Sequence, residues 1–285
     1  DNQSNQIKEA IGFLRKHSNG IFMDEFAKIW LEKRWGGGGG ISYFNFNGAK
    51  LPDISNDKQM MSAMPFTFQD TFLFSCILSD DYNKAIVGLF DQCMTEGPYG
   101  YKDGNFDVTV KENDIVMDVG AWIGDFSAYA ASKGAVVYAF EPVHKSFELL
   151  KKTAELNEGK IHPVNLGLGK KEYESMIYIN EKNISGSGMY FNDSKISEKI
   201  KIITLDKFVK DNNIKKVDFI KVDIEGAERD LLRGAREVLR KFAPKLAICT
   251  YHFPEDPELL EKIIVEANPK YKVAHTRQKL FARVN

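Results

Sequence analysis

Apolar and polar residues alternate along the chain with two different periods, and the period changes near residue 97. Before this point, apolar residues recur every three or four positions, which predicts amphipathic helices over residues 6–35 and again after about residue 70. After it, short apolar runs alternate with amphipathic segments. We therefore expect an N-terminal helical cap over residues 1–95 and a separate domain over residues 96–285.

The second part of the chain has the pattern of an α/β domain. Strands that alternate with helices pair in parallel, because each crossover returns the chain to the same edge of the sheet. The pattern therefore predicts a doubly wound sheet, and it leaves residues 170–203 without an assigned element. In chain order, the predicted elements are a hairpin at 106–110, a strand at 115–119, a helix at 124–133, a strand at 135–140, a helix at 145–157, a strand at 161–165, a helix at 205–212, a strand at 217–222, a helix at 227–241, a strand at 245–250, a helix at 257–267 and a terminal hairpin at 271–284.

Five consecutive glycines occupy positions 36–40. Glycine loses more backbone entropy than any other residue when it is fixed in a packed element. We therefore expect a flexible linker within the N-terminal part.

Composition excludes some classes of function. The formal charge of -1, with 28% charged residues of both signs, gives no field that would hold a nucleic-acid backbone. The three cysteines, Cys76, Cys93 and Cys249, form no CxxC pair or zinc-ligand spacing. No apolar run reaches the roughly 18 residues that cross a bilayer, and the start of the chain lacks a signal-peptide pattern. We expect a cytoplasmic protein that binds neither membranes nor nucleic acid.

A glycine-containing turn follows the first strand of this domain. Asp118 ends the strand, and the turn continues from Gly120 to Gly124. Such a turn lies at the carboxyl edge of a doubly wound sheet, where ligands bind. Glu141 ends the next strand, twenty-one residues after Gly120, at the spacing where a carboxylate reaches ribose hydroxyls. The pair predicts a nucleoside site.

Two residues argue against a dinucleotide at this turn. The phosphate-binding turn of dinucleotide folds reads G-x-G-x-x-G, whereas position 122 is Trp. Asp125 adds a negative charge in the first helical turn, which repels a phosphate. The site therefore favours a ligand without phosphate, and the ammonium and sulfonium groups of S-adenosylmethionine suit the carboxylates of Asp118 and Asp223.

Four motifs in this order resemble the FkbM-type methyltransferase family, within the class of seven-stranded Rossmann-like methyltransferases. The motifs are EGPY at 96–99, DIVMDVGAWIGDFS at 114–127, YAFEPVHKSFELL at 138–150 and DFIKVDIEGAE at 218–228. The resemblance covers residues 96–285 and implies a seven-stranded, mostly parallel sheet with an antiparallel last strand. It also implies S-adenosylmethionine as cofactor and methyl transfer to a hydroxyl oxygen.

The resemblance also implies where the cofactor binds. By position, Asp118, Gly120 and Gly124 would lie at its methionine end, Glu141 at the ribose, and Asn165-Leu166 at the adenine. The further residues expected to bind the cofactor are Tyr99, Ala121, Trp122, Phe126, Ser127 and Asp223. Trp122 departs from the family, in which Asn is commoner at this position.

Methyl transfer to a hydroxyl needs a group that accepts the proton. The candidates are Asp223 and Glu225 after the fourth strand, and His252 after the fifth. We favour His252 as the base, because an imidazole pKa near 6.5 suits proton acceptance at neutral pH. A histidine that is hydrogen-bonded in the loop before Pro254 is an open alternative. A divalent metal held by the three candidates is a further alternative, which we do not favour from the sequence.

The expected function is S-adenosylmethionine-dependent O-methylation of a small molecule or sugar. Two other functions stay open, a catalytically silent S-adenosylmethionine-binding partner subunit and an NAD-dependent oxidoreductase. We expect the Gly- and Ser-rich segment 183–190 and the cap to form the acceptor pocket, and the N-terminal helices are a candidate surface for a homo-oligomer.

Overall fold

The computed structural model describes residues 35–38, 41–46, 48–54, 57, 60, 99–180, 186–190 and 194–284. The helices expected before residue 35, and most of the expected helical cap, lie outside these residues. Within the described residues, no helix is long and apolar enough to cross a membrane.

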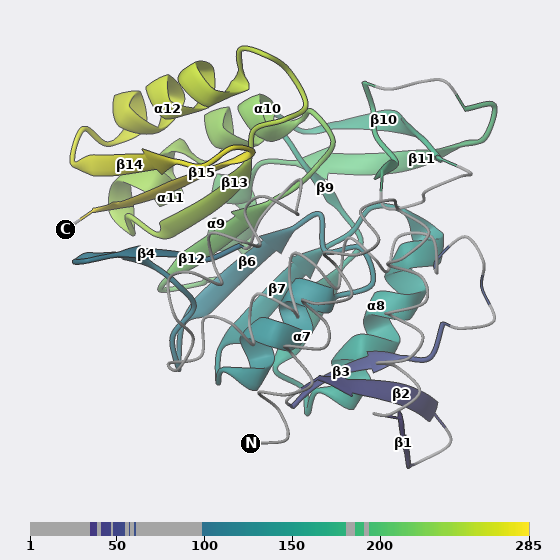
Figure 1. Cartoon of the computed structure of the whole chain (residues 1–285). Helices are drawn as coiled ribbons and strands as arrows, with labels where there is room; N and C mark the ends of the chain where they lie inside the picture. The colour runs from purple at the N-terminus through teal and green to yellow at the C-terminus, as the bar shows by residue number, and fades with distance from the viewer. Residues whose placement is uncertain are drawn as a thin grey trace, which may run out of the picture.

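A seven-stranded sheet forms the centre of the molecule (Figure 1), and its strand order is β14-β15-β13-β12-β6-β7-β8. Strands β13, β12, β6, β7 and β8 pair in parallel, whereas the last strand, β15, is antiparallel to both of its neighbours. The predicted doubly wound sheet with an antiparallel last strand is therefore confirmed. Its strands are β6 (Ile115–Val119), β7 (Val136–Phe140), β8 (Ile161–Val164), β12 (Phe219–Val222), β13 (Lys245–Cys249), β14 (Tyr271–His275) and β15 (Lys279–Val284).

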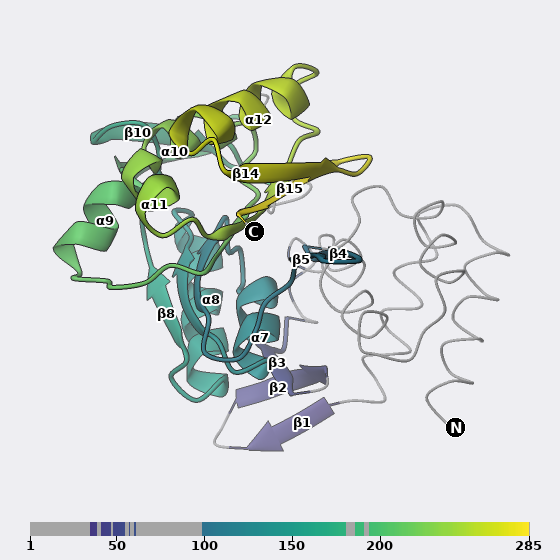
Figure 2. The same cartoon turned by 90° about the vertical axis from the view of Figure 1, so that its left-hand side faces the viewer.

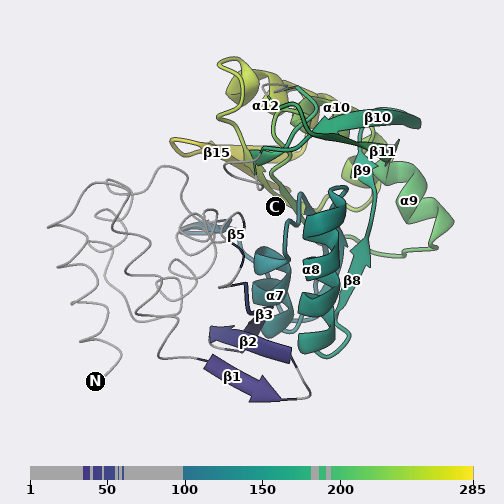
Figure 3. The same cartoon turned by 90° about the vertical axis from the view of Figure 1, so that its right-hand side faces the viewer.

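Helices cover both faces of this sheet (Figures 2 and 3). Alternate residues of each strand point to opposite faces, so that Leu246 and Ile248 belong to one apolar cluster while Ala247 and Cys249 belong to the other. The first cluster packs against α9 (Leu205–Asp211), α10 (Glu228–Arg233), α11 (Arg236–Lys241) and α12 (Asp256–Ala267). The second packs against α7 (Asp125–Ser132) and α8 (His144–Leu156).

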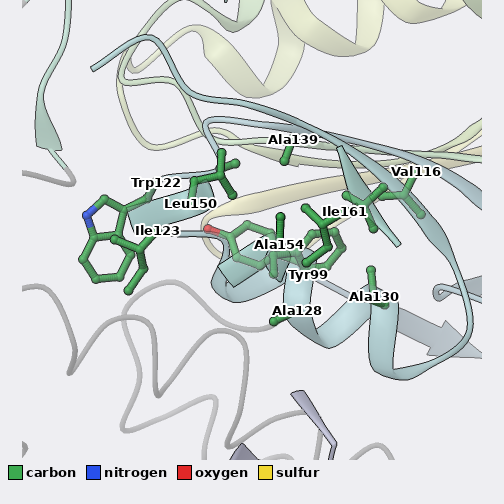
Figure 4. Close-up of a cluster of buried hydrophobic side chains, with 14 of the residues drawn as sticks. Tyr99, Val116, Trp122, Ile123, Ala128, Ala130, Ala139, Leu150, Ala154 and Ile161 are labelled. Atoms are coloured by element: carbon green, nitrogen blue, oxygen red, sulfur yellow. The ribbon is translucent and has the colours of Figure 1, made fainter. Parts of the chain in front are cut away.

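Small side chains bring α7 close to the sheet. Figure 4 shows part of the second cluster, in which Ala128 and Ala130 of α7 lie with Val116 of β6 and Ile161 of β8. All four are buried. Because α7 begins directly after the turn that follows β6, this packing fixes the position of the turn.

The helix predicted over residues 227–241 is divided into α10 and α11. The carbonyl of Gly234 accepts a hydrogen bond from the amide of Asp206 at 3.0 Å instead of continuing the helix. A Cβ at Gly234 would also overlap the carbonyl of Gly169, so this glycine permits a close backbone contact. The prediction of one helix was wrong because these contacts involve residues far away in the sequence.

Residues 167–203, for which the sequence predicted no element, contain a second sheet. Its strands are β9 (Gly167–Leu168), β10 (Tyr173–Tyr178) and β11 (Ser197–Ile203), in the order β10-β11-β9. In β11, buried Ile200 and Ile202 alternate with exposed lysines. This period of two was the available signal. The hairpin predicted at 106–110 forms from β4 (Tyr101–Asp103) and β5 (Phe106–Val108).

The N-terminal part that the structure describes is a sheet. Strands β1 (Trp35–Gly38), β2 (Ile41–Phe46) and β3 (Ala49–Pro52) pair antiparallel. The expected helix and glycine linker are therefore wrong for residues 35–38, because the glycine backbone is paired with β2. Strand β3 packs against α7 and α8 (Figures 2 and 3).

Asn157, at the end of α8, joins this small sheet to the main domain. Its Oδ1 accepts a hydrogen bond from the amide of Lys50 at 3.1 Å, and its Nδ2 donates to the carbonyl of Lys50 at 2.6 Å. We predict that Asn157→Ala lowers the free energy of unfolding by about 1–3 kcal/mol, because both backbone groups lose their partner. Urea denaturation measures this loss. Asn105→Ala, in an exposed turn, is the control, and an equal change in both variants would contradict the prediction.

Candidate functional site

Backbone geometry shapes the turn between β6 and α7. Gly120 has a φ of +80°, and a Cβ there would overlap the carbonyl oxygen of Asp223 on the neighbouring strand. Gly124 has a φ of +86° and precedes α7, where a Cβ would lie 2.6 Å from Cδ1 of Leu150. Glycine is therefore required at both positions. Between them, Trp122 has a φ of +49°, which is rare for a bulky residue.

A buried ion pair lies beneath the turn. Nζ of Lys221, on β12, is 3.2 Å from Oδ1 of Asp118 and donates to the carbonyl oxygen of Gly120 at 2.6 Å. Ser127 donates its hydroxyl to the other oxygen of Asp118 at 2.6 Å. Burial disfavours the charged form of Lys221, but the carboxylates of Asp118 and Asp223 outweigh it and raise the pKa of the lysine. This pair joins β12 to β6.

The sequence analysis assigned Asp118 and Ser127 to the cofactor and gave Lys221 no role. The structure places Asp118 and Ser127 under the turn, where both are completely buried. Lysine within the otherwise apolar strand Phe219–Val222 was the signal for a buried cation.

Glu141, at the end of β7, holds two backbone amides. Its carboxylate accepts hydrogen bonds from the amide of Trp122 at 2.9 Å and from the amide of Val143 at 2.8 Å. Burial raises the pKa of Glu141 to about 8, against the opposing effect of these two hydrogen bonds. The hydrogen bond that the backbone amide of Trp122 donates to Glu141 also explains why Trp122 adopts its unusual backbone conformation.

A pocket opens between the turn, the end of β12 and the second sheet. It includes six of the residues that the sequence analysis assigned to the site, namely Gly120, Trp122, Glu141, Leu166, Asp223 and Glu225. The remaining lining residues are Val119, Phe140, Pro142, Val143, Gly167, Leu168, Ile177, Ser187, Gly188, Met189, Ile200, Ile202, Ile224 and Ala227. The apolar wall from β9, β10 and β11 was missed because those strands were not predicted.

Besides Asp118 and Ser127, five residues expected at the cofactor do not line this pocket: Tyr99, Ala121, Gly124, Phe126 and Asn165. Some of them support the wall instead. Nδ2 of Asn165 donates to the carbonyl oxygens of Glu141 and Pro142 at 2.9 and 3.1 Å. The ring of Tyr99 packs edge-on against that of Phe126 at 5.5 Å.

The three catalytic candidates meet at the carboxyl ends of β12 and β13. Nε2 of His252 lies 3.4 Å from Oε2 of Glu225 and 3.9 Å from Oδ1 of Asp223. The two carboxylate side chains are 18% and 22% exposed for Asp223 and Glu225, whereas that of His252 is 3% exposed. The carboxylates therefore line the pocket, and the imidazole lies behind them.

Neighbouring groups hold these side chains in place. Asp223 accepts hydrogen bonds from the hydroxyls of Tyr99 at 2.6 Å and Tyr251 at 3.3 Å. On the other side of the imidazole, Nδ1 of His252 is 3.2 Å from Oε1 of Glu228, which also accepts the amide hydrogen of Ile224. Glu228 is completely buried and was missed by the sequence analysis.

Electrostatic interactions shift the pKa values of all three candidates. Burial raises the pKa of Glu225, whereas Lys221 and His252 outweigh burial and lower the pKa of Asp223. Burial opposes the charge on His252, but hydrogen bonding to Glu225 and Glu228 raises its pKa to about 11. The ordinary pKa near 6.5 was expected from the sequence, because neither the distances from His252 to Asp223 and Glu225 nor its contact with Glu228 could be derived from the chain order.

Trp122 has a buried polar atom without a partner among the described residues. The indole Nε1 is buried and has no hydrogen-bond acceptor among the residues that the structure describes. An unpaired buried donor is costly, so this nitrogen does not contribute to the stability of the turn.

We predict that Lys221→Met lowers the free energy of unfolding by about 3–5 kcal/mol, because it leaves Asp118 as an uncompensated buried charge. Guanidinium denaturation measures the change. The double variant Asp118→Asn, Lys221→Met should recover most of this loss. Lys216→Met removes an exposed lysine that also pairs with an aspartate, and a loss at Lys221 no larger than at Lys216 would refute the prediction.

The raised pKa of Glu141 predicts a pH-dependent stability. Between its usual pKa near 4.5 and about 8, the folded protein keeps a proton that the unfolded chain releases, so stability falls as pH rises through this window. In Glu141→Gln this component is absent, and the ligand-free variant should show a flatter stability profile in urea unfolding between pH 5 and pH 8. The exposed Glu155→Gln should keep the wild-type slope. Identical slopes in all three proteins would contradict the prediction.

Comparison with known proteins places this site in a family. The methyltransferase FkbM domain matches residues 118–283. The hexuronic acid methyltransferase AglP of Haloferax volcanii is 29% identical over 157 residues, which cover 55% of this chain and 64% of the relative. Methyltransferase 1 of Beauveria bassiana is 28% identical, with coverage of 43% of this chain and 59% of the relative.

A solved structure has the same fold. The methyltransferase FkbM of Methylobacillus flagellatus aligns with a TM-score of 0.50 and 23% identity, covering 81% of this chain and 62% of that protein. The chain thus spans less than two thirds of the length of each of these relatives. The family match covers more than half of the chain and confirms the resemblance seen in its motifs, and the chain belongs to the FkbM methyltransferase domain family.

Proposed function

We propose that this protein is an S-adenosylmethionine-dependent methyltransferase that methylates a hydroxyl group of a sugar or another small molecule. The observation that carries the proposal is the charge of the pocket. Asp223 contributes a charged carboxylate to its wall, Glu141 and Glu225 add two further acidic side chains, and no lysine or arginine is among the described lining residues. Such a wall attracts a cationic ligand and repels the diphosphate of NAD.

The residues of the pocket fit the parts of S-adenosylmethionine. Glu141 lies at the end of β7, where its carboxylate would accept the ribose hydroxyls. Leu166 and Leu168 offer apolar surface for the adenine. Gly120 lines the pocket without a side chain and lies directly against the backbone of Asp223. The carboxylate of Asp223 would face the cationic methionine end.

When bound, S-adenosylmethionine supplies a methyl group on a sulfonium, which a hydroxyl oxygen attacks in line. The protein has to align the acceptor and accept the hydroxyl proton. We assign proton acceptance to the group formed by Asp223, Glu225 and His252, in which the carboxylates reach the pocket and His252 orients Glu225. This differs from the expectation that His252 is itself the base, since its imidazole lies behind the carboxylates.

Two features support a sugar as the acceptor. One relative is named as a hexuronic acid methyltransferase. In addition, Ser187, Gly188 and Met189 of the segment expected to contact the acceptor do line the pocket. Together with the isoleucines of β10 and β11, they give the acceptor side an apolar wall beside a polar floor, which suits a sugar ring.

We predict that calorimetric titration detects binding of S-adenosylmethionine and S-adenosylhomocysteine but not of NAD. The expected discrimination follows from the carboxylates on the wall, which repel phosphates. Gly120→Val should abolish binding, because its side chain would collide with Asp223, while Gly104→Val, in open space, should not interfere. Circular dichroism checks that both variants fold. Binding of NAD alone would overturn the proposal.

We also predict that S-adenosylhomocysteine is released when hexuronic acids or neutral hexoses are offered as acceptors. Glu225→Gln should lose at least tenfold in turnover while its affinity for S-adenosylhomocysteine stays within a few fold, because only the proton acceptor is removed. Cofactor binding without turnover on any acceptor of a broad hydroxyl panel would favour the silent partner subunit instead.

A further inference from the structure

A mixed set of donor atoms lies at the acceptor side of the pocket. Asp223 and Glu225 each present a carboxylate oxygen, and His252 presents a ring nitrogen, and these three atoms lie within 4.8 Å of one another. The two carboxylates also line the pocket. The set therefore combines two carboxylates that are open to the pocket with the buried imidazole of His252.

The spacing of these atoms fits one metal ion. Around an octahedral ion with bonds of about 2.1 Å, neighbouring donors are roughly 3.0 Å apart and opposite donors roughly 4.2 Å apart. Nε2 of His252 lies 3.4 Å from Oε2 of Glu225 and 3.9 Å from Oδ1 of Asp223. The three side chains can thus meet one ion without a rearrangement of the strands.

The surrounding groups are those that support metal ligands elsewhere. A metal-binding histidine usually has its second nitrogen on a carboxylate, and metal-binding carboxylates are themselves hydrogen-bonded. Here Glu228 is 3.2 Å from Nδ1 of His252. The hydroxyls of Tyr99 and Tyr251 donate to Asp223. Nε2 of His252 is thereby directed toward the pocket side.

A second, independent observation indicates a missing positive charge. Glu228 is completely buried, and its Oε2 has no hydrogen-bond donor among the described residues. Three carboxylates, those of Asp223, Glu225 and Glu228, thus lie within 4 Å of a single imidazole. Lys221 compensates Asp223, but for Glu225 and Glu228 the imidazole of His252 is the only ion-pair partner among the described residues. Buried carboxylates in excess of their cations are costly.

A neighbouring set of possible ligands is already used. Glu228, His252 and Asp256 also lie close together. However, Oδ1 of Asp256 binds Nε of Arg229 at 2.6 Å, and Oδ2 accepts the amide hydrogen of Phe253 at 3.1 Å. Both carboxylate oxygens of Asp256 are therefore already hydrogen-bonded at the start of α12. Of the two sets, only the one that includes Asp223 and Glu225 lines the pocket.

We propose that Asp223, Glu225 and His252 bind a divalent cation at the acceptor side of the pocket. Two oxygen ligands and one nitrogen favour Mn²⁺ or Zn²⁺ over Mg²⁺, which prefers oxygen alone. The remaining coordination positions of the ion would face the pocket. Building on the proposed function, the ion would bind neighbouring oxygens of a sugar or sugar acid and so compensate for the absence of lysine and arginine from the described pocket wall.

The test is a titration of the full-length, chelator-treated protein with Mn²⁺, followed by the electron paramagnetic resonance signal of the free ion. We expect one Mn²⁺ per wild-type chain, with competition by Zn²⁺ and weaker competition by Mg²⁺. His252→Ala should weaken Mn²⁺ binding at least tenfold, as should Glu225→Gln. Glu228→Gln, which removes only the carboxylate on Nδ1, should weaken it about 10- to 100-fold.

A matched histidine controls for general effects. His275 lies on the surface with Nε2 at 2.6 Å from Glu261, and His275→Ala should leave Mn²⁺ binding unchanged. Thermal melting establishes that each variant folds, and Glu225→Gln, at a partly exposed position, provides the test if His252→Ala does not. Absence of Mn²⁺ binding in the wild type, or binding in His252→Ala and Glu225→Gln that is as tight as in the wild type, would overturn the proposal.

Titration of the metal-free protein with S-adenosylhomocysteine separates this inference from the proposed function. Binding of S-adenosylhomocysteine without any Mn²⁺ site would refute the cation and leave the methyltransferase proposal intact. Binding of Mn²⁺ without binding of S-adenosylhomocysteine or S-adenosylmethionine would support the cation and refute the methyltransferase.

Discussion

The buried contact between Lys221 and Asp118 is the interaction on which the site depends. A lysine in the middle of a sheet is tolerated only when its charge is paired and its hydrogens are accepted. Lys221 meets both conditions with Asp118 and the carbonyl of Gly120. It thereby fixes the turn after β6 against the end of β12, and Gly120 can lie directly on the backbone of Asp223. The two strand ends that form the pocket are held together from beneath.

The pocket wall has a consistent electrostatic character as a result. Lys221 is directed to the interior, so that the surface of the turn is left with the carboxylates of Glu141, Asp223 and Glu225. A cationic nucleoside or a metal ion suits this wall, whereas a phosphate does not. Trp122 illustrates the same division. Its backbone amide donates a hydrogen bond to Glu141, and this bond accounts for its backbone conformation. Its indole nitrogen has no partner within the described residues.

Elements with a strong local pattern could be predicted from the sequence. Strands such as Ile115–Val119 and helices such as α8 were found because their period and their flanking residues are encoded locally. The three short strands β9–β11 were missed, since their pairing joins residues some thirty positions apart. The glycines of β1 were misread for a related reason, as their pairing with β2, and not their own propensity, makes them a strand.

Candidate site residues followed the same rule. The turn at Asp118–Gly124 and the strand ends at Glu141 and Asp223 lie at one edge of the sheet, because a doubly wound sheet brings the carboxyl ends of its strands together. The individual roles were harder to predict. The position of Asp118 under the turn, and of His252 among three carboxylates, depends on distances between elements that no motif contains.

We propose that Glu141 anchors the ribose of S-adenosylmethionine in this pocket. The most direct test is the number of protons released when S-adenosylmethionine binds at pH 7, obtained by calorimetry in two buffers of different ionisation enthalpy. With a pKa of about 8, Glu141 is mostly protonated in the ligand-free protein. Ribose hydroxyls and a nearby sulfonium favour its charged form. We predict that the wild type releases protons on binding and that Glu141→Gln releases fewer. Binding of S-adenosylmethionine without proton release in the wild type would contradict the account.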